Sequence, residues 1–132
     1  MYADKSLDTK LYSSSVCFDF ALGLKEWEVE NLCDFTSSVL GQRFFVALAK
    51  SRRDDSVLRL TDLYIDTQAS AVGVRKRIAQ YTDCGFLRIV PNPNDGRARI
   101  VQIEPKFDNL LGDYFSAANR IWCMAVAREW QR

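Results

Sequence analysis

The chain has 132 residues, which is enough for one domain that buries a hydrophobic core of its own. Hydrophobic residues make up 48% and charged residues 27%, a balance that is typical of a soluble globular protein and excludes a disordered chain. The net charge is only +1, no apolar run approaches the ~20 residues of a membrane-spanning helix, and the first residues lack the layout of a signal peptide. We therefore expect a cytoplasmic protein without membrane contact.

The chain contains no histidine, and its four cysteines, Cys17, Cys33, Cys84 and Cys123, lie far apart without a C-x-x-C pair. This argues against a zinc site and against a disulfide framework, so neither a metal nor a cofactor is expected. The simplest interpretation is that the thiols are reduced and packed as small hydrophobic groups, with a redox-sensing role for Cys17 or Cys84 as the alternative. No nucleophile elbow, phosphate-binding glycine loop or isolated carboxylate pair is present, and no enzymatic activity is expected.

Helices are predicted for the first part of the chain. Residues 1–24 supply apolar side chains, but serines and a glycine interrupt any long period, which indicates a frayed start followed by a short helix. From Lys25 to Phe35, Trp27 and Leu32 can share one face with Phe35, so this stretch is predicted as an amphipathic helix. A second helix is predicted over residues 39–51, and its inward-facing residues are predicted to be Leu40, Phe44, Val46, Ala47 and Leu48.

Residues 52–84 predict a helix-turn-helix unit. A solvated polar turn over residues 52–55 precedes a short strand over residues 57–60, after which Thr61 can cap a brief helix over residues 62–65. The next helix is predicted over residues 67–84, because Thr67 can cap it and a glycine follows its end. Two short helices joined by a tight turn form such a unit. With a period of about 100° per residue, four residues of the second helix lie on its buried stripe: Ala71, Val74, Ile78 and Tyr81.

A β-hairpin is predicted directly after this helix. Residues 86–90 are rich in aromatic and branched apolar types and run into a Pro/Asn/Gly cluster over residues 91–97, which is a hairpin signal. Gly96 suits a tip that needs positive φ. Arg97 and Arg99 are predicted to project from the tip and the returning strand, and Asp95 to hold an arginine in position through a charge-assisted bond.

The charge is unevenly distributed along the chain. Residues 1–66 carry a net charge of −3, residues 67–100 of +4 and residues 101–132 of zero. The positive charge therefore lies on the predicted helix and hairpin, where a polyanion would need it. A charged surface without a binding role is the alternative. The six basic residues of this segment are Arg75, Lys76, Arg77, Arg88, Arg97 and Arg99.

The outward face of the 67–84 helix favours DNA as the polyanion. Its N-terminal half carries Ala69, Val72 and Gly73, small residues that let a backbone lie close to another surface such as the major groove. Gln68 can read adenine, a basic side chain guanine, and a small apolar side chain a thymine methyl. The residues predicted to bind DNA are Thr67, Gln68, Ala69, Ser70, Val72, Gly73, Arg75, Lys76, Arg77, Asp95, Arg97 and Arg99.

Residues 85–97 read Gly-Phe-Leu-Arg-Ile-Val-Pro-Asn-Pro-Asn-Asp-Gly-Arg, and this run resembles the MarR (multiple-antibiotic-resistance regulator) family of winged-helix repressors. It follows that family's glycine and aromatic or aliphatic residue, its strand, and its Pro/Asn-rich wing ending Asp-x-Arg. Lys76 stands where the family often has arginine, whereas Gly96 replaces the usual basic residue of the wing. The resemblance implies a homodimer on a pseudo-palindromic operator, with Arg97 in the minor groove and Asp95 supporting it.

The last helix, predicted over residues 105–130, carries a long apolar stripe. A helix of ~39 Å exceeds what a small winged-helix body can cover, and surplus apolar surface indicates a partner. A two-fold dimer would set two recognition helices ~34 Å apart. The alternative is that the stripe covers the N-terminal helices of the same chain. The predicted dimerisation residues are Phe107, Leu110, Leu111, Tyr114, Phe115, Ala118, Ile121, Trp122 and Ala125.

The predicted fold is mainly α with a small β-wing, a single winged helix-turn-helix domain over residues 1–132. Residues 39–104 form its DNA-binding core, and residues 1–38 and 105–132 form helical dimerisation regions. The predicted function is a sequence-specific transcription regulator, most often a repressor, with helix 67–84 in the major groove and wing 86–104 in the minor groove. The alternatives are a winged-helix interaction module or adaptor without DNA binding, and a redox-responsive regulator. A small-molecule effector would need a cleft, which Phe18, Trp27 and Phe44 can line if they are not simply core residues.

Overall fold

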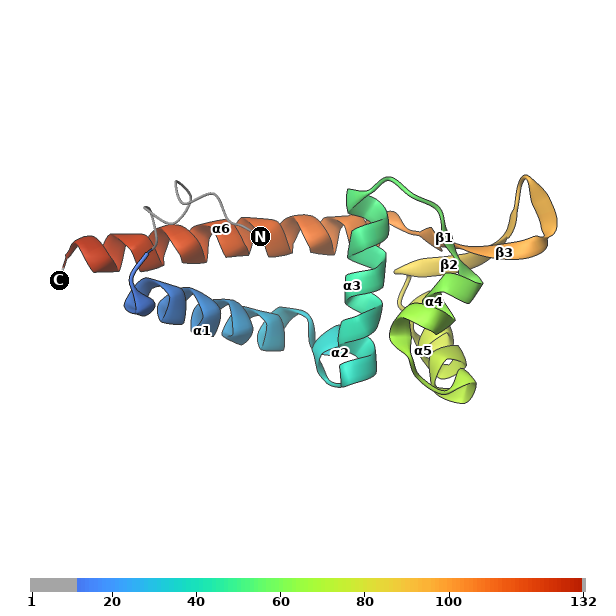
Figure 1. Ribbon diagram of the computed structural model, residues 1–132, viewed down its shortest axis with the longest axis horizontal. Coiled ribbons are helices and arrows are strands. Elements are labelled where there is room, and N and C mark those ends of the chain that lie inside the picture. The colour runs from blue at the N-terminus through green and yellow to red at the C-terminus, as the bar shows by residue number, and fades with distance from the viewer. Residues whose placement is uncertain (1–11, 132) are drawn as a thin grey trace, which may run out of the picture.

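The computed structural model describes residues 12–131 and shows an arm that projects from a winged unit (Figure 1). The arm consists of α1 (Ser14–Asn31) and α6 (Pro105–Trp130), which lie side by side. This is the mainly helical fold with a small wing that the sequence predicts. The winged unit contains α2 (Cys33–Thr36), α3 (Val39–Arg53), β1 (Leu58–Arg59), α4 (Leu60–Thr67), α5 (Ala71–Asp83), β2 (Leu87–Asn92) and β3 (Asp95–Ile103).

The N-terminal helix is longer than the sequence predicts. A single helix, α1, replaces the predicted short helix and the first part of the predicted helix over residues 25–35, and the short α2 follows it after Leu32. The serines do not break the period but begin the helix, because the Ser13 side chain accepts a hydrogen bond from the Val16 N–H at 3.3 Å. The frayed start predicted for the first residues falls largely on residues 1–11, outside the described residues.

Contacts join α1 to α6 along the arm. Near the free end, the rings of Phe20 and Trp122 lie edge to face with centroids 5.2 Å apart. Near the winged unit, the Tyr114 hydroxyl donates to Glu28 at 2.9 Å. Gly23 allows this close approach, because a Cβ atom there would lie 2.8 Å from the Ile121 side chain. The arm is therefore an antiparallel helix pair within one chain, and α1 covers much of the apolar stripe of α6.

The winged unit contains a three-stranded antiparallel sheet in the order β1-β3-β2. Leu58 of β1 pairs with Val101 of β3, and β2 pairs with β3 from Leu87↔Ile103 to Pro91↔Arg99. Beyond that point the register shifts to Asn92↔Asp95, so three residues of β3 bulge out near the tip of the hairpin. Within residues 12–131, no helix is long and apolar enough to cross a membrane.

One hydrophobic core joins the sheet to the helices of the winged unit and to the first turns of α6. Aromatic rings fill its centre: the Phe35 ring stacks on Tyr81 with centroids 4.5 Å apart and meets Phe107 edge to face at 5.9 Å. Burial of this apolar surface stabilises the fold by roughly 25 cal/mol per Å². The wholly buried large side chains of the winged unit and the first turn of α6 are Phe35, Phe44, Leu48, Leu63, Thr67, Val74, Tyr81, Leu87 and Phe107, and Val16 is wholly buried in the arm.

Three local predictions for this region are wrong. The predicted strand is only Leu58–Arg59, and α4 begins directly at Leu60 because the Asp62 carboxylate, rather than Thr61, caps it by accepting from the Arg59 N–H at 3.2 Å. Val46 was predicted to point inward but is 48% exposed, because it lies on the face of α3 that the core does not cover. Residues 52 and 53 continue α3 instead of forming a polar turn.

Candidate nucleic-acid interface

The turn between α4 and α5 sets where the recognition helix begins. Gln68 has φ 53° and breaks the helical path, and the Ser70 side chain accepts from the Gly73 N–H at 3.1 Å, so the helix starts at Ala71 with Ser70 as its cap. Thr67, the predicted cap, is instead the last residue of α4. It is 0% exposed, and its hydroxyl donates to the Leu63 carbonyl at 2.8 Å. Its side chain therefore cannot contact DNA, which corrects that prediction.

The inward face of α5 follows the predicted period at three of four positions. Val74 and Tyr81 are fully buried and Ile78 is half-buried. Ala71 is exposed instead, because it is the first residue of the helix and precedes the point where the helix meets the core.

Tyr81 anchors α5 to α2. Its hydroxyl donates to the Asp34 carbonyl at 2.8 Å while its ring stacks on Phe35. Burial raises the pKa of Tyr81, so the hydroxyl remains protonated and keeps its role as a donor. The recognition helix is therefore held in the winged unit by its C-terminal half, which leaves its N-terminal half to face outward.

Two residues predicted on the outward face of the helix, Ala69 and Gly73, and one predicted beside that face, Arg77, pack against the protein instead. Ala69 is half-buried and packs on the core. A Cβ atom at Gly73 would lie 3.2 Å from the Ser70 Oγ and 3.6 Å from Leu40 of α3, so this side of the residue faces the helix cap and α3. Arg77 donates to the Ser38 hydroxyl at 2.7 Å, which ties α5 to the cap of α3. These contacts replace the close approach to DNA that the sequence predicts for Ala69 and Gly73.

The remaining predicted residues of the helix form an exposed surface. Val72 is 68% exposed at the first turn of α5, and Gln68 and Ser70 are exposed beside it. Arg75 and Lys76 are exposed on the next turn, and within residues 12–131 neither side chain has a protein partner. One apolar side chain, two polar side chains and two unpaired cationic side chains thus face solvent together at the N-terminal half of the helix.

The hairpin places two further cations in solvent. Arg97 and Arg99 are exposed, and in the part of the chain that the structure describes their side chains have no partner. Asp95 does not hold an arginine side chain as predicted; its carboxylate accepts from the Arg97 backbone N–H at 3.1 Å and so shapes the backbone of the bulge. Gly96 does not have positive φ, because the turn is made by residues 93 and 94.

Four of the six basic residues are therefore free, and two have structural roles. Arg88 of β2 is paired with Glu104, the residue that follows β3, and Arg77 is held by Ser38. The free cations lie on α5 and the hairpin, which Figure 1 shows at the end of the molecule opposite the tip of the arm. Free cations on two neighbouring elements can bind a chain of phosphates.

The predicted dimerisation residues are mostly covered within the same chain. Phe107 is 0%, Leu111 8% and Ala125 2% exposed, because the core and α1 pack on them, and this corrects their assignment to a dimer interface. Phe115 is 59% exposed and remains available. The half-buried members of the set are Leu110, Tyr114, Ala118, Ile121 and Trp122.

A cleft of about 440 Å³ lies between the arm and α3. Tyr114 forms part of its wall, and burial together with the hydrogen bond to Glu28 raises the pKa of Tyr114 to about 12. Phe18, Trp27 and Phe44 do not line the cleft: Phe44 is a core residue, and the other two lie on the arm. The lining residues are Glu28, Leu32, Phe35, Thr36, Gln42, Phe45, Val46, Ala49, Lys50, Arg53, Tyr114 and Phe115.

The cysteines are free, but they are not packed as the sequence predicts. Cys17, Cys33 and Cys123 are exposed, and only Cys84 is half-buried. Within residues 12–131, no group of three or more His, Cys, Asp or Glu residues is placed to hold a metal ion.

Sequence reasoning missed Arg43, which holds the turn of the interface. Its guanidinium donates to the Thr67 carbonyl at 2.9 Å and fixes the end of α4 next to Gln68. No sequence signal identifies this role, because the two residues are far apart in the chain and only the packing of α3 on α4 brings them together.

Comparison with known proteins supports the same fold. No protein-family model matches the chain, and the search of curated proteins found no match. Among solved structures, the transcriptional regulator Tm0710 from Thermotoga maritima aligns with a TM-score of 0.63 and 16% identity over 86% of this chain and 74% of its own. A variant of MepR from S. aureus aligns with a TM-score of 0.62 and 13% identity over 90% and 85%.

A MarR variant from E. coli in complex with operator DNA aligns with a TM-score of 0.55 and 16% identity over 86% of this chain and 76% of its own. At these identities the likeness concerns the fold. The chain has the winged-helix fold of MarR-type transcriptional regulators.

Proposed function

We propose that this protein is a sequence-specific DNA-binding transcription regulator, a repressor that acts as a homodimer on a pseudo-palindromic operator. The observation that carries the proposal is the set of four free cations, Arg75, Lys76, Arg97 and Arg99, on the exposed faces of α5 and the hairpin. The fold shared with a MarR variant solved in complex with operator DNA supports it. The cytoplasmic location expected from the sequence is part of this proposal.

Each part of the surface has a distinct role in this proposal. The N-terminal half of α5 enters the major groove, where Val72 meets a thymine methyl, Arg75 or Lys76 binds guanine and Gln68 reads adenine. The hairpin reaches the minor groove with Arg97, while Arg99 binds a phosphate. Asp95 supports this contact through the backbone of the bulge and not through a side-chain ion pair.

The exposed apolar surface of the arm supports the homodimer. Phe18 is 65%, Val29 59% and Trp130 86% exposed, all on α1 and α6, although each helix is already covered on one side by the other. Leu22, Phe115 and Met124 are also exposed on the same two helices, and exposed apolar surface of this kind is typical of an interface. A second copy of the same arm fits it best, because a two-fold pair of arms places one recognition helix at each end.

The cleft between the arm and α3 supports a small-molecule effector. Its volume of about 440 Å³ lies in the range of ligand pockets, and its aromatic walls surround one partly buried carboxylate, Glu28. An effector bound there would contact the arm and the winged unit together, so it would act on the angle between them. A change of this angle would in turn change the affinity of the regulator for DNA.

The experiment that tests the proposal is a salt titration of binding to a pool of genomic DNA fragments, with wild type beside Arg97→Ala. We expect tight binding that selects a palindromic fragment and weakens steeply with salt, because phosphate neutralisation releases counterions. Arg97→Ala should bind more weakly and reduce the salt slope by about one for each of the two chains of the dimer. Equal, feeble binding by both proteins would support the alternative, an interaction module or adaptor that does not bind DNA.

A further inference from the structure

The arm joins the winged unit through two single-residue connections, Leu32 between α1 and α2 and Glu104 between β3 and α6, and the second of these forms a corner. β3 ends at Ile103 and α6 begins at Pro105, so Glu104 alone separates the strand from the helix. The first turn of α6 is fixed in the winged unit, since Phe107 is wholly buried and Lys106 donates to the Cys84 carbonyl at 2.6 Å. The contacts of this first turn therefore help to set the direction in which the arm leaves the winged unit.

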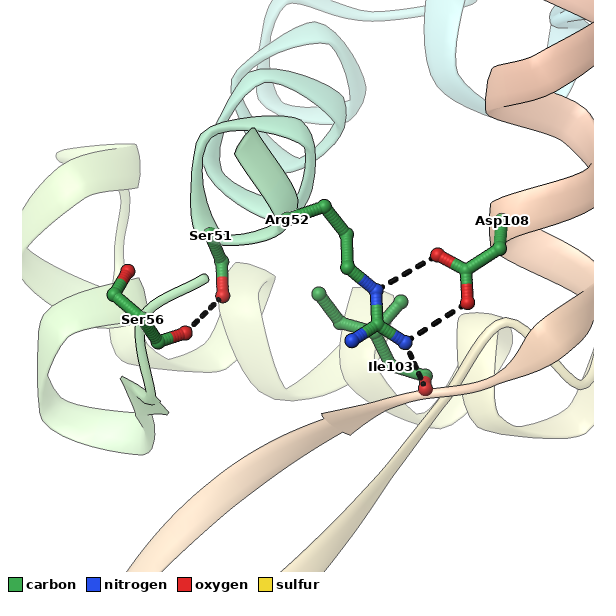
Figure 2. A network of polar contacts seen from close by, with 5 residues as sticks. All are labelled: Ser51, Arg52, Ser56, Ile103 and Asp108. Atoms are coloured by element: carbon green, nitrogen blue, oxygen red, sulfur yellow. Dashed lines mark hydrogen bonds and ion pairs between the residues drawn. The ribbon is translucent and has the colours of Figure 1, made fainter. Parts of the chain in front are cut away.

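Arg52 spans the corner from the last turn of α3 (Figure 2). Its Nε and Nη2 atoms donate to the two carboxylate oxygens of Asp108 at 2.7 and 2.9 Å, and Nη2 also donates to the Ile103 carbonyl at 2.9 Å. One guanidinium thus joins α3, the end of β3 and the first turn of α6. The planar fork suits such a bidentate contact, and the dipole of α6 favours a carboxylate at its N-terminal turn.

The end of α3 that carries Arg52 is itself fixed. The Ser51 hydroxyl donates to the Ser56 carbonyl at 2.7 Å, which closes the loop after α3 (Figure 2). Leu48, one turn earlier, is wholly buried. The guanidinium therefore reaches α6 from a rigid base. A bidentate contact from a rigid base restricts the angle at the corner, whereas a contact from a mobile loop would follow the arm.

The length of α6 amplifies any change at this corner. A helix of 26 residues spans ~39 Å at ~1.5 Å per residue, so a tilt of ~10° at its start displaces its far end by ~7 Å. Successive base pairs are ~3.4 Å apart along DNA. A tilt of a few degrees in each protomer therefore changes the separation of two recognition helices by about one base pair.

We propose that Arg52 is a positioning residue that sets the half-site spacing of the dimer on DNA by fixing the angle between the arm and the winged unit. The inference rests on the proposed function, because only a dimer paired through its arms turns this angle into a spacing. The ion pair itself is 42% and 41% exposed and would contribute little to stability as a surface pair. Its effect arises from its place at the base of a long helix.

The first test measures the angle without DNA. Spin labels at Gly96→Cys, where a Cβ atom has nothing within 4 Å, and at the exposed Cys123 report the distance from the wing to the arm by double electron–electron resonance. The other three cysteines are replaced by serine, and labelled chains are diluted with unlabelled protein so that only distances within one chain contribute. We expect Arg52→Gln and Asp108→Asn to broaden the distance distribution of the wild type.

The second test measures spacing on DNA with unlabelled protein. The selected palindrome is lengthened or shortened by one base pair at its centre. The wild type is expected to lose affinity for the altered site by about tenfold, whereas Arg52→Gln and Asp108→Asn are expected to lose about threefold or less. A difference of this size is the one expected for coupled sites. Arg52→Lys keeps the charge but loses the fork, so it should behave like Arg52→Gln. Affinity for an isolated half-site should be unchanged in all of them.

The control for both tests is Arg59→Gln, which removes another exposed Arg–Asp pair, with Asp62, that lies wholly within the winged unit. It should leave the distance distribution and the spacing preference as in the wild type. An Arg52→Gln protein with the wild-type distribution overturns the inference whatever its DNA binding. A wild type that binds no DNA, with a broadened distribution in Arg52→Gln, overturns the proposed function and retains Arg52 as the residue that fixes the corner.

Discussion

At the scale of single residues, alanine substitutions at Arg75 and Arg77 are predicted to have different effects on DNA binding and on stability, although only one residue separates the two arginines. Arg75 is free, so Arg75→Ala should weaken DNA binding and change the free energy of unfolding by less than about 0.5 kcal/mol. Arg77 donates to Ser38 at a half-buried site, so Arg77→Ala should lower the free energy of unfolding by about 1–2 kcal/mol. Urea unfolding and a DNA titration of the two variants separate these effects.

The same pair of arginines also tests the proposed function. If Arg75→Ala binds DNA as tightly as the wild type, the outward face of α5 is not the reading surface. Salt slopes decide whether the lost contact is to phosphate, since each phosphate contact contributes about 0.9 to the slope on duplex DNA. Arg77→Ala should keep the wild-type slope because its charge is directed at α3.

The raised pKa of Tyr114 predicts that the stability of the protein depends on pH. The tyrosine pKa is raised to about 12 in the folded protein by burial first and by the hydrogen bond to Glu28 second, against an ordinary value near 10. The folded state thus favours the neutral phenol, so its contribution is fully present below about pH 10 and is lost as pH rises towards 12. Chemical denaturation at several pH values should show this decline, with a shallower decline in Tyr114→Phe.

At the scale of elements, replacing either of two helical glycines with alanine is predicted to change the stability of the protein, in opposite directions. A Cβ atom at Gly41 of α3 would lie 2.5 Å from the Phe35 carbonyl oxygen, which is backbone and cannot move aside, so Gly41→Ala should destabilise the protein by about 1–3 kcal/mol. Gly112 of α6 has nothing within 4 Å of such an atom, so Gly112→Ala should stabilise it by up to about 1 kcal/mol. Equal effects in urea unfolding would contradict the close packing of α2 on α3.

The elements themselves could largely be predicted, because their signals are local. The period of Val74, Ile78 and Tyr81, and Gly85 after the helix with φ 83°, located the recognition helix to within a few residues. Its start was misassigned because both Thr67 and Ser70 can cap a helix, and only the left-handed Gln68 between them decides for Ser70. Propensity cannot choose between two good caps when the backbone of one intervening residue makes the choice.

The candidate site was less predictable, because several of its residues depend on contacts between distant segments. The angular position of Arg77 on α5 left it beside the reading face, and only the cap of α3 at Ser38 shows that it is engaged. Phe107 and Leu111 showed a clear apolar period, but the period does not distinguish a stripe covered by the same chain from one covered by a partner. Residues with free charges, such as Arg97, were assigned correctly as exposed because a hairpin tip has little protein around it.

At the scale of the whole molecule, the arm predicts the oligomeric state. The protein should sediment as a dimer of about 30 kDa, twice the 15.1 kDa of one chain, because the exposed apolar residues of α1 and α6 otherwise remain in water. Phe18 is 65% exposed on α1, and Phe18→Glu places a charge in that surface, so it should shift the equilibrium towards the monomer. Analytical ultracentrifugation over a range of concentrations measures this shift.

The matched control is Val57→Glu, which introduces the same charge at a residue that is 67% exposed in the winged unit. It should sediment as the wild type does. Because a monomer presents a single recognition helix and wing, Phe18→Glu should also bind the palindrome with about half the wild-type salt slope while it retains its affinity for one half-site. A wild type that stays monomeric at all concentrations, or an equal shift in Val57→Glu, would show that the arm is not where two chains meet.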